Sequence, residues 1–341
     1  MNKPMSDRPT KSNIGIIGNN NFVSGDYKRA LDLYEETLQI AREDGDKVTE
    51  AATLGNIGST YAAIGETRRA IDLYDQALAL SRELGDRKSE SNALGNLGST
   101  YLNLGEIQRA TEFFEQALII AREIGDRAGE ANRLSNLGNA YAMRREHNRA
   151  LKFYEQALKI TRELGDYVGE SVTLNNLGNA NLQTNNIERA RSLYEESLLI
   201  SERVGNTTGT AFAYSNLGNI LLRMGDLELA LTYIQKSLEL AHKIGDRRGE
   251  ALRLGTLANI YLKLGKTENA IQHYNEALDI AIRIGDPRTE TLSLLNLGRV
   301  FIKEERYEEA RDYLTKALAL AKRIELPSVN DINQALELAT K

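Results

Sequence analysis

The chain has 341 residues, no cysteine and a formal net charge of −5. The missing thiols exclude disulfide bonds and thiol catalysis, and the acidic balance argues against nucleic-acid binding, which needs a concentrated basic surface. No apolar run approaches the roughly 20 residues of a membrane span. The first residues lack the apolar segment of a secretory signal, so a cytoplasmic location is the expectation.

The N-terminal part of the chain is expected to be irregular. Residues 1–10 contain two prolines and little apolar surface, which predicts a disordered tail. The residues that follow hold apolar side chains at helical spacing, but Asn19, Asn20 and Asn21 are expected to interrupt that helix. The first repeat of an array is commonly atypical, because one of its faces meets solvent.

From Gly25 onward the sequence repeats itself every 40 residues. The clearest copy is L-S-N-L-G-N-A-Y at residues 134–141. Close copies begin at Leu54, Leu94, Leu174, Tyr214, Leu254 and Leu294. A fixed period of this size predicts an array of stacked structural repeats.

Each repeat is predicted to contain two helices, here called helix A and helix B. In the repeat that begins at Asp86, this residue suits an N-cap and Glu90 places a negative charge in the first turn of helix A. Apolar residues then recur every three or four positions. Gly105 is expected to end helix A, helix B to span residues 107–124, and Gly125 to end helix B.

Small residues recur at fixed places in both helices. Helix B has alanine at one position throughout: Ala30, Ala70, Ala110, Ala150, Ala190, Ala230, Ala270 and Ala310. Helix A has glycine at one position: Gly58, Gly98, Gly138, Gly178, Gly218 and Gly298. A glycine inside a helix costs roughly 0.5–1 kcal/mol against alanine, so we expect the two small residues to face each other and bring the helices close.

These signature residues resemble the tetratricopeptide repeat (TPR). The usual TPR period is about 34 residues; the 40-residue period, with its G-N-L-G-N and I-G-D-R phrases, is similar to the repeats of the Pins/LGN family and of bacterial and cyanobacterial TPR arrays. The resemblance implies an all-α fold, a right-handed α-solenoid of eight repeats over residues 11–325. Residues 326–341 are predicted to form a capping helix, N-capped by Ser328, with Val329, Ile332 and Leu336 on its packed face.

The sequence predicts no catalytic site, no metal site and no cofactor. The three histidines, His147, His242 and His273, occupy three different positions in the repeat, so they share no common geometry. The recurring glycines lie at helix ends or helix contacts rather than in a phosphate-binding motif. We therefore expect a protein that is not an enzyme.

The TPR resemblance implies that one face of helix A lines a concave groove. Ala52, Asn56, Ser59 and Ala63 mark the four groove positions in one repeat, and asparagine dominates the second and third positions along the array. The predicted peptide-binding residues at these two positions are Asn56, Asn96, Asn136, Asn139, Asn176, Asn179, Asn216, Asn219, Asn259 and Asn296. Arg223, Lys263, Arg299 and Lys303 add a basic end to the groove.

Asparagine is a mediocre helix former, so this repetition needs a reason. A carboxamide both donates and accepts hydrogen bonds and could hold the backbone of an extended peptide. Alternatively, the amides bond to neighbouring helices and only order the array. The basic end could bind acidic side chains or a C-terminal carboxylate, although exposed Lys and Arg commonly serve only solvation.

The expected function is therefore a non-catalytic scaffold that binds an extended, possibly acidic, segment of a partner protein. The expected partners include neither nucleic acid nor a membrane, and the oligomeric state stays open. One alternative is the sensor or regulatory TPR component of a signalling NTPase or protease system. Another is a TPR array that associates with itself.

Overall fold

The structure is a computed structural model that describes residues 11–23 and 25–340, with no side-chain description for residues 11–13 and 23. Over these ranges the chain forms 17 helices and no strand. This confirms the predicted all-α class. The predicted tail, residues 1–10, lies outside the described residues. Internal packing divides the chain into two units, residues 1–166 and 167–341, which the sequence did not indicate.

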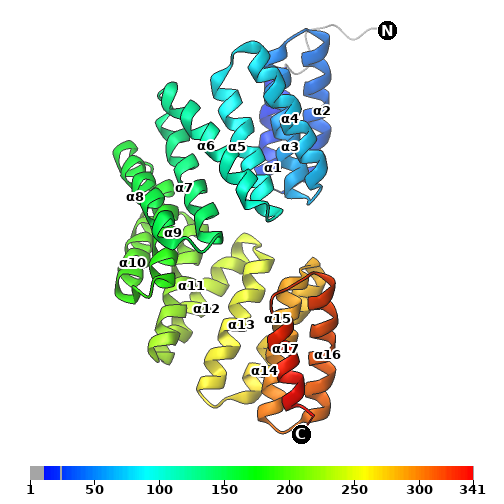
Figure 1. Cartoon of the computed structure of the whole chain (residues 1–341), viewed down its shortest axis with the longest axis vertical. Coiled ribbons are helices and arrows are strands. Elements are labelled where there is room, and N and C mark those ends of the chain that lie inside the picture. The colour runs from blue at the N-terminus through cyan, green and yellow to red at the C-terminus, as the bar shows by residue number, and fades with distance from the viewer. Residues whose placement is uncertain (1–10, 24, 341) are drawn as a thin grey trace. The chain divides into compact units, whose positions relative to one another are not determined.

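The first unit contains four helix pairs, with the odd-numbered helices as helix A and the even-numbered helices as helix B (Figure 1). The pairs are α1 (Lys11–Val23) with α2 (Tyr27–Glu43), α3 (Lys47–Ala63) with α4 (Thr67–Leu84), α5 (Arg87–Asn103) with α6 (Ile107–Glu123), and α7 (Arg127–Met143) with α8 (His147–Leu164).

The second unit contains four further pairs and a last single helix. The pairs are α9 (Tyr167–Gln183) with α10 (Ile187–Arg203), α11 (Thr207–Met224) with α12 (Leu227–Ile244), α13 (Arg247–Lys263) with α14 (Thr267–Ile284), and α15 (Pro287–Lys303) with α16 (Tyr307–Arg323). The last helix is α17 (Val329–Leu338).

Within each unit, packing follows the order of the chain. Each helix A packs on its own helix B, and that helix B packs on the next helix A. Successive A helices also touch: α1, α3, α5 and α7 in the first unit, and α9, α11, α13 and α15 in the second. One layer of each unit is therefore built from A helices alone, and this layer carries the predicted groove positions.

The predicted helix boundaries are confirmed in the repeat at Asp86. The side chain of Asp86 accepts a hydrogen bond from the backbone N–H of Ser89 at 3.1 Å, so it is the N-cap of α5. Gly105 and Gly125 follow the ends of α5 and α6 with φ angles of 81° and 69°. This left-handed conformation suits glycine because glycine has no Cβ to clash.

The recurring alanines of helix B are fully buried, and a Cβ on Gly218 would lie 3.5 Å from the Ala230 carbonyl oxygen, but the atoms nearest to each of the recurring helix-A glycines belong to a large side chain. A Cβ built on Gly98 would lie 2.6 Å from the ring of Phe114, and one on Gly138 would lie 2.4 Å from the ring of Tyr154. The glycine therefore makes room for the large core side chain that follows one turn after the alanine. The same arrangement recurs at Gly178, where a Cβ would meet Tyr194 at 2.4 Å.

Two predictions about the ends of the array need correction. Helix α1 runs unbroken through the asparagines, because the Asn21 amide donates to the Ile17 carbonyl at 2.8 Å and Asn19 accepts a hydrogen bond from Tyr34 at 2.6 Å. Ser328 occupies the N-cap of α17 but its side chain makes no capping hydrogen bond.

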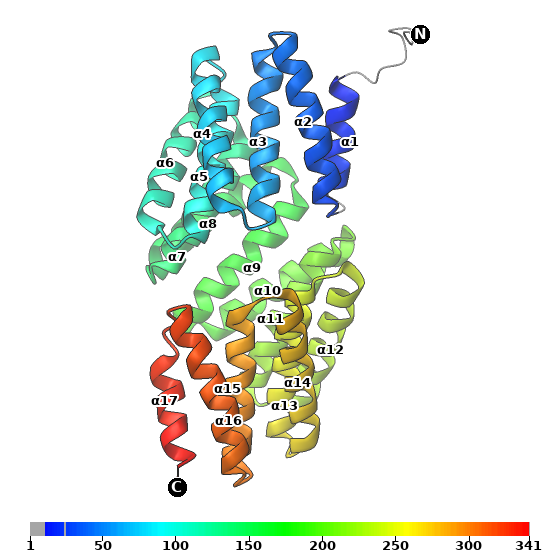
Figure 2. The ribbon, with the colours of Figure 1, turned by 90° about the vertical axis from the view of Figure 1, so that its right-hand side faces the viewer.

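The packed face of α17 is as predicted. Ile332 is fully buried, and Val329 and Leu336 pack against the same core. Helix α17 lies beside α16 and also contacts α15 (Figure 2). It thereby covers apolar surface that the last repeat would otherwise leave open.

Candidate functional site: grooves lined by the A helices

The four predicted groove positions lie at the surface of the A-helix layer. Every residue at the first and fourth positions from α3 to α15 is exposed, and every residue at the second position is half-buried. The stripe chosen from the sequence is thus accessible in all seven repeats from α3 to α15. It does not belong to the core.

Asparagines at the third groove position bond to tyrosines inside their own repeat. The Oδ1 atom of Asn139 accepts a hydrogen bond from the Tyr154 hydroxyl at 2.7 Å, and Asn179 accepts one from Tyr194 at 2.6 Å. Asn259 accepts the same bond from Tyr274 at 2.7 Å. Burial raises the pKa of Tyr274 to about 12, so its hydroxyl remains a donor at neutral pH.

Sequence reasoning missed this pairing, although a signal was present. The bonded tyrosine always stands 15 residues after the third groove position. Asn219 is different because the residue 15 positions later is Ile234, which has no hydroxyl. Asparagine at the third position therefore has a structural role in three repeats, and its Nδ2 group makes no side-chain hydrogen bond there among the described residues.

Asparagines at the second groove position are largely free of internal bonds. Asn216 donates to the Asn175 side chain at 3.2 Å and Asn56 donates to Asn19 at 3.5 Å. Over the part of the chain that the structure describes, no side-chain hydrogen bond engages the amides of Asn96, Asn136, Asn176 and Asn296, nor that of Asn219 at the third position. These half-buried or accessible amides can bond to a ligand.

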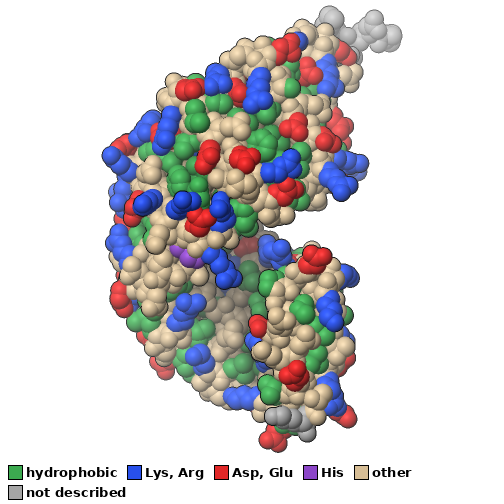
Figure 3. Space-filling view, in the orientation of Figure 1, with side chains coloured by type: hydrophobic (Ala, Val, Ile, Leu, Met, Phe, Trp, Pro, Cys, Tyr) green, Lys and Arg blue, Asp and Glu red, His purple; other side chains and the backbone are tan. Residues whose placement is uncertain are grey.

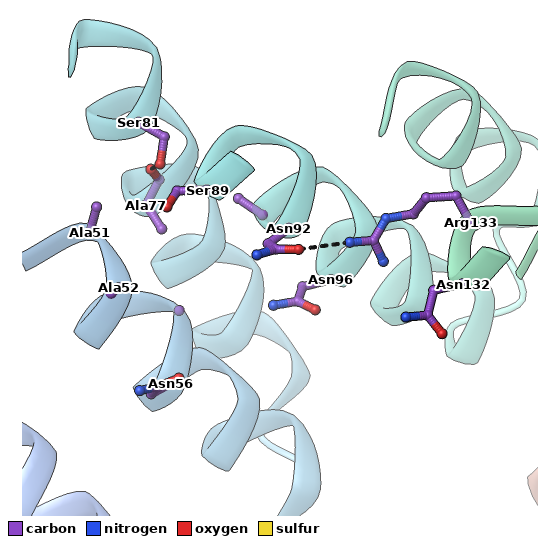
Figure 4. Close-up of a pocket in the computed structure, with 12 residues that line it drawn as sticks. Ala51, Ala52, Asn56, Ala77, Ser81, Ser89, Asn92, Asn96, Asn132 and Arg133 are labelled. Atoms are coloured by element: carbon purple, nitrogen blue, oxygen red, sulfur yellow. Dashed lines mark hydrogen bonds between the residues drawn. The ribbon is translucent and has the colours of Figure 1, made fainter. Parts of the chain in front are cut away.

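The A-helix layer of the first unit is hollowed between α3, α5 and α7. This first-unit hollow has a volume of about 400 Å³ and is lined by polar side chains, including Asn56, Asn96, Asn132 and Arg133. Figure 4 shows the Arg133 side chain reaching from α7 toward Asn92 of α5, with the amides of Asn96 and Asn132 nearby. Arg133 was not among the residues predicted from the sequence.

The A-helix layer of the second unit has a corresponding hollow of about 370 Å³ between α11, α13 and α15. It brings together the predicted residues Asn216, Asn219, Asn259 and Asn296. Phe212, Leu252 and Leu292 also line it and are 48%, 45% and 48% exposed. These three apolar residues share the first groove position, where the first unit has Ala52, Asn92 and Asn132, so the second-unit hollow is the more apolar of the two.

The predicted basic residues are all in the second unit. Arg223, Lys263, Arg299 and Lys303 are exposed. Among the described residues, none of the four forms an ion pair. Their charges are therefore not neutralised by a neighbouring carboxylate, although Arg299 is close enough to Tyr274 to lower the pKa of that hydroxyl.

The described part of the chain holds no group of three or more His, Asp or Glu side chains placed to bind a metal ion. None of the described helices combines the length and the apolarity that crossing a bilayer demands. Acidic and basic side chains are interspersed on the visible face of each unit (Figure 3).

The family follows from the sequence match across these repeats. The tetratricopeptide repeat model matches residues 13–83, 89–163, 144–203, 169–243, 209–283 and 248–323. The chain belongs to the tetratricopeptide repeat family. No curated protein matches it as a whole-sequence relative.

Solved TPR structures share the fold at low sequence identity. The apo form of the quorum sensor NprR from B. thuringiensis is 18% identical over 93% of this chain and 90% of its own, with a TM-score of 0.72. A Rap protein complexed with Competence and Sporulation Factor is 15% identical over 97% of both chains, with a TM-score of 0.66.

A third structure belongs to a larger protein. It is a signal transduction ATPase with numerous domains (STAND) with a tetratricopeptide repeat sensor, from Pyrococcus horikoshii. It is 17% identical with a TM-score of 0.68, and the match covers 97% of this chain but 50% of the ATPase.

Proposed function

We propose that this TPR protein is a non-catalytic scaffold that binds an extended peptide segment of a partner protein along its A-helix layer. The observation that carries the proposal is the row of amides at the second groove position. Asn96, Asn136, Asn176 and Asn296 face the surface without internal side-chain bonds over the described residues, and each sits in a helix where alanine would be more favourable.

A carboxamide suits an extended peptide because it offers a donor and an acceptor together. The N–H and C=O groups of a peptide backbone need both, whatever the side chains of the peptide are. Amides repeated on successive A helices can therefore hold a chain by its backbone. This supports a sequence-tolerant clamp, with selectivity supplied by the residues on either side of the row.

The second unit offers two sources of selectivity. Phe212, Leu252 and Leu292 present half-exposed apolar surface in its hollow, which favours apolar side chains on the ligand. The unpaired charges of Arg299 and Lys303 favour acidic ones. We therefore expect a partner segment that combines apolar and acidic residues. The resemblance in fold to the quorum sensor and to the Rap–factor complex is compatible with ligand binding by the array.

The test compares two triple variants. Binding partners are captured from the native source, identified by mass spectrometry, and the bound segment is synthesised for calorimetry. The clamp variant changes Asn96, Asn136 and Asn176 to Ala. It loses hydrogen bonds worth roughly 0.5–1.5 kcal/mol each, so we expect affinity to fall by about one to three decades while the melting temperature holds or rises.

The matched control changes Asn139, Asn179 and Asn259 to Ala. These asparagines accept hydrogen bonds from buried tyrosines, so this variant should melt at a lower temperature. If the clamp variant instead loses stability and binds the captured segment as the wild type does, the amides only order the array and the clamp is wrong.

A second candidate function rests on the resemblance to the STAND sensor, in which a TPR array forms one part of a larger ATPase. The chain would then be the sensor or regulatory part of an NTPase or protease system. Capture of an NTPase or a protease as the stoichiometric partner would favour this function over a simple adaptor.

A further inference from the structure

The segments that join helix A to helix B carry very different charges along the chain. The six residues after α7, residues 144–149, read R-R-E-H-N-R and include three arginines and one glutamate. The equivalent residues after α15, residues 304–309, read E-E-R-Y-E-E and include four glutamates and one arginine. In every other repeat the same six positions hold at most two side chains of one sign. We call these two segments the basic turn and the acidic turn.

The basic turn keeps a surplus of positive charge at the surface. Arg144, Arg145 and Arg149 are all exposed. Glu146 pairs with Arg144 at 2.8 Å and with Arg149 at 2.9 Å, so one carboxylate is shared between two guanidinium groups. Among the described residues, Arg145 forms no ion pair. The turn therefore presents more positive charge than its own glutamate can neutralise.

The acidic turn has the opposite surplus. Its four glutamates are exposed: Glu304, Glu305, Glu308 and Glu309. Arg306 pairs with Glu309 at 2.5 Å. Glu304 accepts a hydrogen bond from the Thr267 hydroxyl at 3.2 Å, but over the described part of the chain neither it nor Glu305 or Glu308 forms an ion pair. Three carboxylates of this turn therefore have no paired cation.

The two turns share one backbone conformation. Arg145 and Glu305 stand at equivalent positions of the repeat and have left-handed φ angles of 61° and 59°. At this position of the other repeats the chain has glycine or asparagine. The opposite charges are thus presented from matching places, and each turn can be given the residues of the other without a change of backbone.

We propose that the basic turn of one molecule binds the acidic turn of a second copy of this chain. The two surfaces are complementary in charge, which favours their association and sets its specificity. Each copy carries both turns, so each offers both halves of the contact. Because the two surfaces differ, the contact is heterologous and can link more than two copies. It lies outside the groove positions and goes beyond the proposed peptide binding.

This contact should be weak and sensitive to salt. Two turns bury less surface than a standard protein interface, so we expect a dissociation constant of about 10–1000 µM. Salt screens exposed charges over roughly 10 Å at 0.1 M. We therefore expect the affinity to fall at least about tenfold when the salt concentration rises from about 0.05 to about 0.5 M.

The experiment measures the average mass of the full chain by sedimentation equilibrium over a concentration series in low salt. The Glu-turn variant, Arg144→Glu with Arg145→Glu, copies residues 304 and 305 into the basic turn. The Arg-turn variant, Glu304→Arg with Glu305→Arg, makes the opposite exchange. Each variant should stay monomeric at concentrations where the wild type associates, whereas an equimolar mixture of the two should form complexes.

The double exchange places all four substitutions in one chain. It keeps the net charge of −5 and restores opposite charges on the two turns, so it should associate with itself as the wild type does. Arg144→Leu with Arg145→Gly copies residues 104 and 105 and removes both charges without reversal. It should weaken association even if the Glu-turn variant folds poorly.

The matched control reverses two charges in the turn after α3, through Arg68→Glu with Arg69→Glu. Both arginines are exposed, and this control should associate like the wild type. The clamp variant, with Asn96, Asn136 and Asn176 changed to Ala, keeps both charged turns and should also associate. Loss of peptide binding and loss of self-association are thereby measured separately.

A wild type that stays monomeric over the whole series in low salt would overturn the proposal. Association that the Glu-turn and Arg-turn variants leave unchanged would also overturn it, because another surface would then hold the copies together. The same holds for a folded double exchange that fails to restore the association which each single exchange abolishes.

Discussion

At the scale of single residues, the asparagines of the groove divide into two kinds. The side-chain oxygen atoms of Asn139, Asn179 and Asn259 accept hydrogen bonds from buried tyrosines. Among the described residues, the side chains of Asn136 and Asn176 make no such bond. The two kinds stand three residues apart on the same helix face. The structural interpretation of the asparagine pattern therefore holds at the third groove position, and the proposed ligand binding concerns the second position of the same repeat.

Glutamates near the start of helix A form ion pairs that were not predicted from the sequence. Glu90 was expected only to suit the helix dipole, but it is 6% exposed and accepts hydrogen bonds from Arg82 at 2.9 Å and Arg87 at 2.6 Å. Burial alone would raise the pKa of Glu90, but the two arginines outweigh it and the pKa is lowered. Glu130 is held in the same way by Arg122 and Arg127.

Because of these two glutamates, we expect the free energy of unfolding to fall in acid. Because the folded-state pKa of Glu90 and Glu130 lies below the ordinary value of 4.5, their contribution is fully present above that pH and is lost as pH falls below it. The double variant Glu90→Gln, Glu130→Gln should be less stable than wild type at pH 7, by about 1–3 kcal/mol for each charged hydrogen-bonded site.

The measurement is urea denaturation at several pH values between neutrality and pH 3. The difference between wild type and the double variant should shrink as pH falls through the acid range. Glu115→Gln, at an exposed position, is the control and should track wild type throughout. A difference that does not change with pH would show that the carboxylate charges contribute nothing.

At the scale of helices and turns, the backbone in the turn after helix A is left-handed even in repeats that have no glycine there. Arg145, Asn185 and Glu305 have φ angles of 61°, 62° and 59°. These angles lie in the same left-handed region as those of Gly65 and Gly105, which hold the equivalent position in other repeats with φ angles of 87° and 81°. The turn geometry is imposed by the packing of helix A on helix B, so a residue with a Cβ is held in a conformation that it disfavours.

Glycine at these turns should therefore stabilise the array. Left-handed backbone costs a residue with a Cβ roughly 1–2 kcal/mol, and the greater freedom of unfolded glycine removes part of the gain. We expect Arg145→Gly and Glu305→Gly each to raise the free energy of unfolding by about 0.5–1 kcal/mol. The reverse change, Gly105→Arg, should lower it, and thermal and urea unfolding of the three variants decide the matter.

At the scale of the whole molecule, stability is distributed along each unit. Among the described residues of the first unit, the pairs α3–α4 and α5–α6 pack against helices on both sides, whereas α1 and α2 contact only α3 outside their own pair. Stability in such an array is a sum of repeat and interface terms. The core cluster around α2 includes the buried residues Ala30, Tyr34 and Ile57.

Hydrogen exchange should show this gradient in the first unit. We expect the amides of α1 and α2 to exchange well before those of α5 and α6, because opening a terminal pair breaks one interface and opening an inner pair breaks two. Equal protection of the two pairs under native conditions would contradict the prediction and indicate that the unit opens only as a whole.

The sequence by itself determined the parts of this protein that depend on local and periodic information. The 40-residue period and the apolar spacing determined the helix pairs. Asp86, Gly105 and Gly125 set helix ends because capping and left-handed turns are decided within a few residues. The choice of the groove face came from the TPR resemblance, and periodicity then identified the residues on that face, because residues one helical turn apart share a face.

Only the tertiary structure decided which polar groups are already bonded. The Tyr154–Asn139 bond, the Arg82–Glu90 bond and the Arg133–Asn92 bond each join residues from different helices. Whether such groups meet depends on the packing of helix on helix. The sequence holds a trace of the first of these contacts alone, in the recurring 15-residue separation of asparagine and tyrosine. The division at residue 166 emerged only from the packing within each unit.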